Sequence, residues 1–196
     1  MTPAIERVDH LVYATPDLDE TVAALHAQLG VCAAPGGRHD GRGTRNALIA
    51  IGTRAYLEIV GPDPDQPALS APRWFGIDAL VKPRLFTWAA HAQELGARGR
   101  RGSRQRSDGV VLEWTFTAPS PVPSLVPFLI DWGASPHPAA AAPAGVTLVD
   151  LCGEHPDPED VRAQLNAVGM TLSVSPGAHT TLIATLRSAQ GDVELR

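Results

Sequence analysis

The sequence predicts an α+β fold built from repeated β-α-β-β-β modules, and three observations support this prediction. First, the hydrophobic pattern changes from the alternation of a strand over residues 8–13 to the spacing of a helix after Pro16. Second, the same change returns at residues 146–168, after a segment rich in proline and alanine. Third, each module closes on a strand that holds one acidic residue among apolar ones, namely Glu58, Asp131 or Glu194.

The composition is that of an ordinary globular chain. It has 196 residues, 44% of them hydrophobic and 19% charged, with a formal net charge of -5. This charge gives no general attraction to nucleic acid or to an anionic membrane, so neither is expected as a partner. No apolar run approaches the roughly 20 residues of a membrane helix, and the N-terminus lacks a secretory signal. We therefore expect a cytoplasmic protein in which Cys32 and Cys152 are free thiols.

The first module is expected over about residues 5–62. Alternation in the strand over 8–13 places Asp9 and His10 on opposite faces. Asp17 is the expected N-cap of the following helix, and Gly30 is its expected end. A glycine-rich polar loop over 35–43 is then followed by a hairpin of two strands, 46–51 and 55–60.

The second module is expected over about residues 83–133, with strands at 84–89, 110–116 and 127–133. Between them we expect a weak helix over 90–95, an arginine-rich run over 98–106 and a hairpin turn at Asp108-Gly109. Residues 134–145 form a Pro/Ala linker, which divides a domain over 1–133 from a third β-α-β-β-β-like module over 146–196. Alignment of Leu85 and Asp150 with His10 puts the closing acids 48, 46 and 44 residues downstream.

His10 and Glu58 form the sharpest candidate pair, because each lies in the middle of an apolar strand. An imidazole and a carboxylate that meet on one sheet face can bind a divalent metal, or act as a base with its orienting partner. The alternative is a core histidine that is hydrogen-bonded to a buried acid. Asp131 is a candidate third metal ligand, and its alternative is an edge-strand carboxylate bonded to backbone.

Several polar and aromatic residues are candidates for binding a substrate. Arg45 and Asn46 belong to a polar segment that would form either a pocket rim or a solvated loop. Most of the arginines over 98–106 are expected on a solvated face, but Arg104 leads into a strand pair and could clamp a carboxylate or phosphate. Trp132 would suit a pocket wall, although tryptophans are more often core, and His137 is expected only to cap a turn.

Motifs of several common enzyme classes are missing from the sequence. It has no Gly-x-Ser-x-Gly elbow, no phosphate-binding loop, no dinucleotide fingerprint and no paired cysteines for zinc. A serine hydrolase of the usual kind is therefore not expected.

Three stretches resemble glyoxalase-like proteins of the vicinal oxygen chelate superfamily, which also includes bleomycin-resistance proteins and extradiol dioxygenases. The stretches are Val8-Asp9-His10-Leu11-Val12-Tyr13-Ala14 with Pro16-Asp17-Leu18-Asp19, Gly43-Thr44-Arg45-Asn46-Ala47-Leu48-Ile49, and Tyr56-Leu57-Glu58-Ile59-Val60. The resemblance implies paired β-α-β-β-β modules whose sheets form a cleft. It also implies metal ligands on the first and last strands of each module, which here are His10 and Glu58, with Asp131 as a weaker third.

The sequence departs from the family pattern in two ways. Leu85 and Thr87 stand where a fourth ligand would be sought, and the third module exceeds the usual pair. We therefore expect either a metal-dependent lyase, isomerase or dioxygenase, in which His10 and Glu58 act in catalysis, or a metal-free protein that binds or sequesters a small ligand. The third module should cover its apolar face on its own chain or in a homodimer, and a homodimer is the expected assembly.

Overall fold

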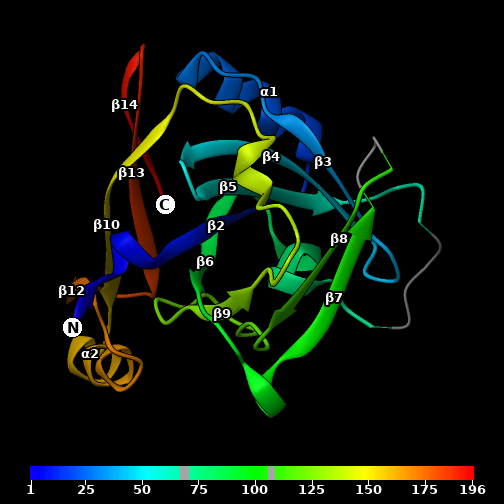
Figure 1. Cartoon of the computed structure of the whole chain (residues 1–196). Helices are drawn as coiled ribbons and strands as arrows, with labels where there is room; N and C mark the ends of the chain where they lie inside the picture. The colour runs from blue at the N-terminus through cyan, green and yellow to red at the C-terminus, as the bar shows by residue number, and fades with distance from the viewer. Residues whose placement is uncertain (67–70, 106–108) are drawn as a thin grey trace.

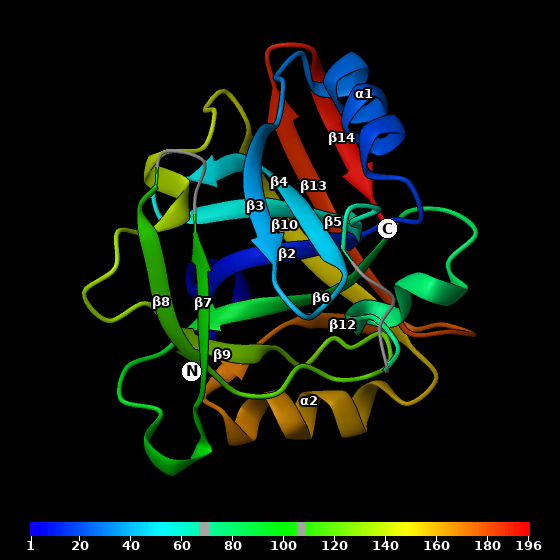
Figure 2. The ribbon, with the colours of Figure 1, turned by 90° about the vertical axis from the view of Figure 1, so that its right-hand side faces the viewer.

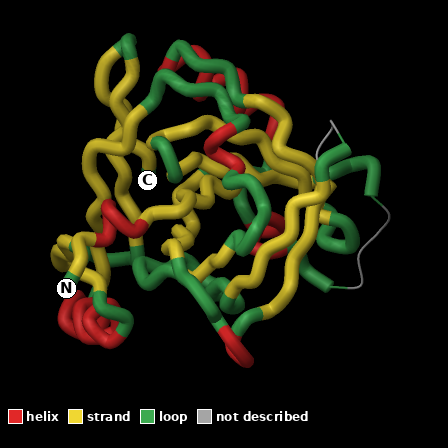
Figure 3. The backbone as a smooth tube through the Cα atoms, viewed as in Figure 1, coloured by secondary structure: helices red, strands yellow, loops and turns green. Residues whose placement is uncertain are grey.

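The computed structural model describes residues 1–66, 71–105 and 109–196 and shows an α+β fold dominated by strands (Figure 3). Arg106, the last residue of the expected arginine-rich run, and Asp108 of the expected hairpin turn lie outside the described residues. No helix among the described residues is both long enough and apolar enough to cross a lipid bilayer.

Eight strands form one mixed, nearly closed sheet in the order β3-β4-β5-β2-β6-β9-β8-β7 (Figures 1 and 2). The strands are β2 (Val8–Ala14), β3 (Ala34–His39), β4 (Thr44–Gly52), β5 (Ala55–Pro62), β6 (Arg84–His91), β7 (Arg100–Gln105), β8 (Val111–Phe116) and β9 (Phe128–Asp131). In each half the first strand lies parallel beside the last, and the others follow in antiparallel pairs. The two halves, β2–β5 and β6–β9, join through the antiparallel pair β2 and β6.

The register of this central pair shows which positions of the two halves correspond. His10 pairs with Ala89, Leu11 with Trp88 and Val12 with Thr87. With the local twofold axis placed through the central Leu11–Trp88 pair, His10 corresponds to Thr87 and Val12 to Ala89. The alignment of Leu85 with His10 that the sequence spacing favoured is wrong, because Leu85 pairs with Tyr13 and packs on the opposite face of the sheet from Ala89, the partner of His10.

The same axis identifies the counterpart of Glu58. Val12 pairs with Glu58 on β5, and Ala89 pairs with Phe128 on β9. Phe128, rather than Asp131, therefore occupies the position of Glu58 in the second half. The prediction assumed nearly equal spacing along the chain in both halves. It selected Asp131 instead of Phe128 because the loops of the two halves differ in length.

Helix α1 (Leu18–Leu29) begins and ends as the sequence predicts. The Asp17 side chain accepts a hydrogen bond from the backbone N–H of Glu20 at 3.0 Å, and Gly30 has a φ of 71°. Only glycine adopts that left-handed conformation without steric cost. The buried face of α1 packs on β4, β5 and β14, and Figure 2 shows the helix beside β14.

Two local predictions are wrong. Part of the expected glycine-rich loop is strand β3, in which Gly36 lies against Asn46 and Arg104; a Cβ there would be 2.9 Å from the Arg104 Nη1. The expected weak helix over 90–95 is absent, because β6 continues to His91 and only a short 3-10 turn, η3 (Gly96–Arg98), follows. Ala89 and Ala90 are fully buried between neighbouring strands, and this packing outweighs their helical propensity.

The C-terminal part forms a second sheet of order β12-β10-β13-β14. Its elements are β10 (Thr147–His155), α2 (Pro158–Ala167), β12 (Ser173–Pro176), β13 (Thr181–Ser188) and β14 (Gly191–Leu195), and a short strand β11 (Met170–Thr171) pairs with β1 (Thr2–Pro3). The first strand, β10, pairs antiparallel with β13 instead of parallel with the last strand. The third module therefore has a helix after its first strand, as the first half has, but does not repeat the strand pairing of either half, and both Asp150 and Glu194 are exposed.

Two hydrophobic clusters divide the core. One lies between the small sheet, α1, α2 and the outer face of the large sheet, and it includes Leu11, Leu57, Trp88, Leu151 and Leu186. The apolar face of the third module is therefore covered by its own chain. The other cluster lines the concave face of the large sheet with Val12, Tyr56, Phe86, Phe116 and Phe128. The predicted domain division at residues 134–145 stays a prediction.

Candidate functional site

A cavity of about 270 Å³ lies on the concave face of the large sheet. The first half of the sheet supplies mainly ionisable side chains to its wall, and the second half supplies four aromatic rings together with two arginines. The residues that matter below are His10, His39, Tyr56, Glu58, Arg104, Trp114, Phe116, Phe128 and Trp132, with Arg42, Trp74 and Arg101 among the other lining residues.

His10 and Glu58 meet in this cavity, as the sequence predicted they could. Both are buried, with 4% and 7% of their surface exposed. The His10 Nε2 lies 3.8 Å from the Glu58 Oε2. The His10 ring stacks on Tyr56, with ring centroids 4.7 Å apart, and meets the edge of Phe128 at 5.4 Å. These two rings hold the imidazole plane in place.

Asp9 determines which His10 nitrogen carries the proton. Its Oδ1 lies 2.7 Å from the His10 Nδ1, and a carboxylate can only accept, so Nδ1 donates. In neutral His10 the lone pair is then on Nε2, which faces Glu58. A break in the β2–β6 register between Val8 and His10 allows neighbouring side chains to meet in this way. A carboxylate that orients an imidazole is the usual support of a histidine metal ligand or base.

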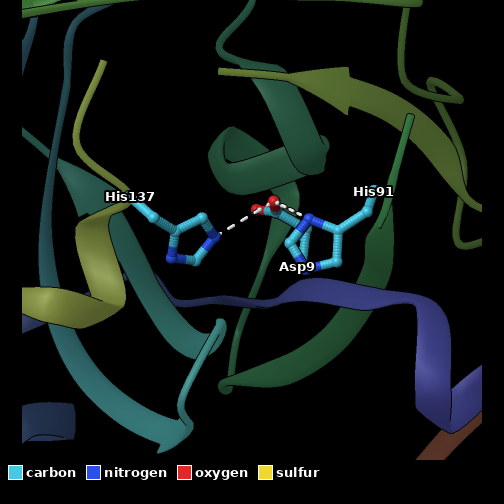
Figure 4. Close-up of side chains that lie close together, drawn as sticks. All are labelled: Asp9, His91 and His137. Atoms are coloured by element: carbon cyan, nitrogen blue, oxygen red, sulfur yellow. Dashed lines mark hydrogen bonds and ion pairs between the residues drawn. The ribbon is translucent and has the colours of Figure 1, made fainter. Parts of the chain in front are cut away.

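The other oxygen of Asp9 is also fully engaged (Figure 4). The Oδ2 accepts from the Trp132 indole N–H at 3.0 Å, and it lies 3.1 Å from the His137 Nε2 and 2.8 Å from the His91 Nδ1. Burial alone would raise the pKa of Asp9, but the hydrogen bonds from His10, His137 and His91 outweigh it and hold the pKa far below its usual value. Asp9 is therefore a buried anion at neutral pH.

Asp9, His91 and His137 are themselves a candidate metal cluster, because one ligand atom of each lies within 4.8 Å of the others. The hydrogen bonds favour a different role. The His137 Nδ1 accepts from the Ala139 backbone N–H at 3.2 Å, so in the neutral ring Nε2 carries the proton that it shares with Asp9. A metal at this point would need the lone pair of that same nitrogen. The cluster is better suited to hold Asp9 in place beneath His10.

Polar neighbours hold Glu58 in its charged form. Burial would raise the pKa of Glu58, but the nearby His10 and His39, a hydrogen bond from Asn46 and the charge of Arg104 together lower it. The Asn46 amide N–H donates to the Glu58 Oε1 at 2.5 Å, and the Arg104 guanidinium donates to the Asn46 Oδ1 at 3.0 Å. Arg104 on β7 thus reaches across to the first half of the sheet.

His39 adds a third group to this end of the cavity. Its Nε2 lies 3.6 Å from the Glu58 Oε1, and its Nδ1 lies 3.0 Å from the Thr44 hydroxyl. Burial lowers the pKa of His39, although the charge of Glu58 partly opposes this. A neutral imidazole is the form that binds a metal. His10 and His39 therefore each approach one oxygen of the Glu58 carboxylate, although their ligand atoms and that of Glu58 do not all lie within 4.8 Å of one another, as those of Asp9, His91 and His137 do.

The other candidates from the sequence lie in different surroundings. Arg104 and Trp132 line the cavity, whereas Asn46 lies behind Glu58 and supports it. Arg45 points outward and pairs with Asp19 at 2.8 Å. The carboxylate of Asp131 accepts from the backbone N–H groups of Glu94 and Gly133 and borders a neighbouring surface hollow, so the structure does not bring it to His10 and Glu58.

Sequence reasoning missed three residues of the site: Asp9, His91 and His137. Strict alternation placed Asp9 on the far face of its strand, and no local signal marks the irregular register. His39 was noted only as part of a polar loop. His137 does cap a turn, η4 (Pro138–Ala140), but it also reaches Asp9 from a distant part of the chain.

Comparison with known families agrees with this architecture. The model of the glyoxalase-like domain family matches residues 8–169, which is most of the chain. The chain therefore belongs to the glyoxalase-like domain family of the vicinal oxygen chelate superfamily. No curated protein sequence matches the chain.

Among solved structures, a hypothetical protein from Staphylococcus aureus matches with a TM-score of 0.63 and 14% identity, over 95% of this chain and 83% of that one. This match supports the fold alone. Methylmalonyl-CoA epimerase from Mycobacterium tuberculosis matches with a TM-score of 0.45 and 20% identity, over 71% of this chain and 95% of that one. Methylmalonyl-CoA epimerase from Streptomyces coelicolor matches with a TM-score of 0.44 and 22% identity, over 65% of this chain and 98% of that one.

Proposed function

We propose that the protein is a glyoxalase-like enzyme that binds a small molecule in the cavity of its large sheet and uses a divalent metal held by His10 and Glu58. One observation carries the proposal: Asp9 fixes the proton of His10 on Nδ1, so that the Nε2 lone pair faces the Glu58 carboxylate at 3.8 Å. This is the arrangement of a ligand pair supported from behind by a carboxylate.

The residues present fit a divalent ion. The pKa of Glu58 is lowered and that of His39 is lowered, so the carboxylate is charged and the imidazole neutral, as ligation requires. His10 and Glu58 would hold the metal, and His39 is a stronger candidate third ligand than Asp131. Bound there, a divalent metal would supply Lewis-acid polarisation of substrate oxygens and so support lyase, isomerase or dioxygenase chemistry.

The chain's own residues supply the remaining functions. Asp9 keeps the His10 lone pair directed into the cavity, and Asn46 and Arg104 keep Glu58 ionised. Glu58 is then able to accept a proton from a bound substrate. Arg104 and Trp132 form part of the binding wall, whereas Asn46 supports Glu58 from behind and Arg45 pairs with Asp19 outside the cavity.

A metal-free binding or sequestering protein is the second candidate, and the register favours it specifically. The counterparts of His10 and Glu58 in the second half are Thr87 and Phe128, so the second half brings neither an imidazole nor a carboxylate to these positions. The cavity would then hold a small ligand without transforming it.

Metal analysis of protein purified without chelator separates the two candidates. The enzyme proposal expects stoichiometric metal that is lost in His10→Ala and Glu58→Gln. Two controls locate the metal: Asp131→Asn removes a carboxylate outside the cavity, and His91→Ala removes one member of the Asp9 cluster. Retention of metal in both controls is expected. Absence of metal from the wild type would favour the binding protein, and loss in His91→Ala alone would move the site to the Asp9 cluster.

We further propose that residues 1–133 form the ligand-binding domain, that 134–145 act as a connection, and that 146–196 serve to cover the outer face of the large sheet. His137 in the connection contacts Asp9, so this segment also supports the site. A homodimer in the cytoplasm stays a prediction, which size-exclusion chromatography with light scattering would test.

A further inference from the structure

We propose that the cavity takes an aromatic monocarboxylate, which binds with its ring against the aromatic wall of the second half and its carboxylate at the mouth, against Arg42 and Arg101. The inference rests on the proposed function in one respect, since it makes His10 and Glu58 the reacting end. Three features of the cavity carry it: the apolar wall, the distribution of charge and the size.

The apolar wall consists of second-half residues at positions where the first half has polar groups. Phe128 stands where the first half has Glu58, and Phe116 lines the cavity beside it. Trp114 covers Gly102 on the neighbouring strand, where a Cβ would lie only 2.5 Å from the ring, and it packs against Trp132 with centroids 5.2 Å apart. Aromatic side chains of this kind stack on flat apolar groups.

The cavity wall carries more positive than negative charge, which a neutral ligand would not require. Among the residues that the structure describes, three arginines, Arg42, Arg101 and Arg104, line it against two carboxylates, Asp40 and Glu58. This local excess of positive charge is notable because the whole chain carries a net charge of -5. An excess of one cation matches a ligand with one negative charge.

Position along the cavity decides where that charge binds. Arg104 is 6% exposed, donates to Asn46 and lies close enough to Glu58 to lower the pKa of that carboxyl, so its charge is balanced inside the protein. Arg42 and Arg101 also line the cavity and, unlike Arg104, are exposed to solvent. The guanidinium of Arg42 lies over the Trp74 ring at 4.2 Å, which uses its flat face and leaves its N–H edge for a carboxylate.

The size of the cavity limits the ligand. About 270 Å³ is slightly below the roughly 300–1,000 Å³ of most small-molecule pockets, which suits one ring with a short acid chain. The carboxylate outside and the ring in the middle would leave the inner substituents of the ligand beside His10 and Glu58.

The test compares 3-phenylpropionate with the neutral 3-phenylpropionamide, using the protein as purified. Quenching of intrinsic fluorescence reports binding, because Trp74, Trp114 and Trp132 line the cavity whereas Trp88 is buried in the other cluster. We expect the acid to bind about tenfold more tightly than the amide. In the Arg42→Gln/Arg101→Gln double variant the acid should lose that advantage and the amide should bind as before. Arg98→Gln, which removes an exposed arginine that does not line the cavity, should leave both unchanged.

Equal binding of acid and amide, an acid preference that survives in the double variant, or no binding of either compound would overturn the inference. His10→Ala separates it from the proposed function. If that variant loses metal and keeps the acid preference, both proposals stand. If the wild type holds no metal but prefers the acid through the two arginines, only the metal proposal fails. If His10→Ala abolishes the preference, the carboxylate binds at the inner end and the proposed orientation is wrong.

Discussion

Asp9→Asn should reverse the tautomer of His10 while leaving the fold in place. The substitution keeps the size of the side chain but replaces one carboxylate oxygen with an NH₂ donor. Three contacts gather on the Oδ2 and one on the Oδ1, so the amide oxygen is expected to take the Oδ2 side. The amide N–H then faces the His10 Nδ1, which must accept, and the proton of His10 moves to Nε2.

The magnitude follows from the hydrogen bonds. Metal binding by the variant requires the proton to return to Nδ1, where it would face another donor in a buried position. An unsatisfied buried polar group costs about 1–3 kcal/mol, which corresponds to a loss of roughly 5- to 150-fold in metal affinity. Stability should fall by a similar amount, because bonds to a charged acceptor become bonds to a neutral one.

Two measurements check this prediction. Competition with a chromophoric chelator gives the metal affinity, and long-range ¹H–¹⁵N NMR of the histidine rings gives the tautomer. Asp131→Asn is the matched control, since its carboxylate binds backbone N–H groups away from the cavity. An Asp9→Asn protein that folds, keeps the proton of His10 on Nδ1 and binds metal as tightly as the wild type would refute the reasoning.

Three further predictions concern stability. Gly36→Ala should lower the free energy of unfolding in urea by about 1–3 kcal/mol, because its Cβ would crowd Asn46 and Leu48. Gly52→Ala is the control, since its Cβ would make only ordinary contacts and should change little. Equal effects of the two substitutions would contradict this packing. Thr87→Val should stabilise the protein by about 1 kcal/mol or more, since the buried Thr87 hydroxyl has no hydrogen-bond partner among the described residues; a loss of stability would show that it has one. The pKa of Glu58 is lowered in the folded state, so the stabilisation from its charge is present above about pH 4.5 and is lost as the pH falls further. In acid unfolding titrations the wild type should therefore lose stability more steeply than Glu58→Gln. Parallel curves for the two proteins would contradict this prediction.

Local chemistry made much of the first half predictable. Asp17 and Gly30 mark the ends of α1 because capping and left-handed backbone depend on single residues. The hairpin of β4 and β5 follows from two apolar runs separated by a turn. Strand β3 could not be predicted, because Gly36 serves the close approach of Arg104 from a strand far along the chain, and glycine in sequence indicates a loop.

The candidate site was predictable in its centre and not in its surroundings. His10 and Glu58 stand out as polar residues in apolar strands. Asp131 has the same local pattern but lies three residues beyond the true counterpart of Glu58, which is Phe128. The contact of Asp9 with His10 depends on an irregular strand pairing. The contact of Asp9 with His137 depends on the path of the linker, which brings His137 back to the large sheet.

The most direct test is an anomalous diffraction experiment on crystals soaked with a divalent transition metal. We expect one peak between the His10 Nε2 and the Glu58 carboxylate, with His39 as the nearest further nitrogen, and none among Asp9, His91 and His137. A peak at the cluster of Asp9, His91 and His137 would contradict the proposed metal site. So would the absence of a peak in the cavity of crystals that bind the metal fully at another position.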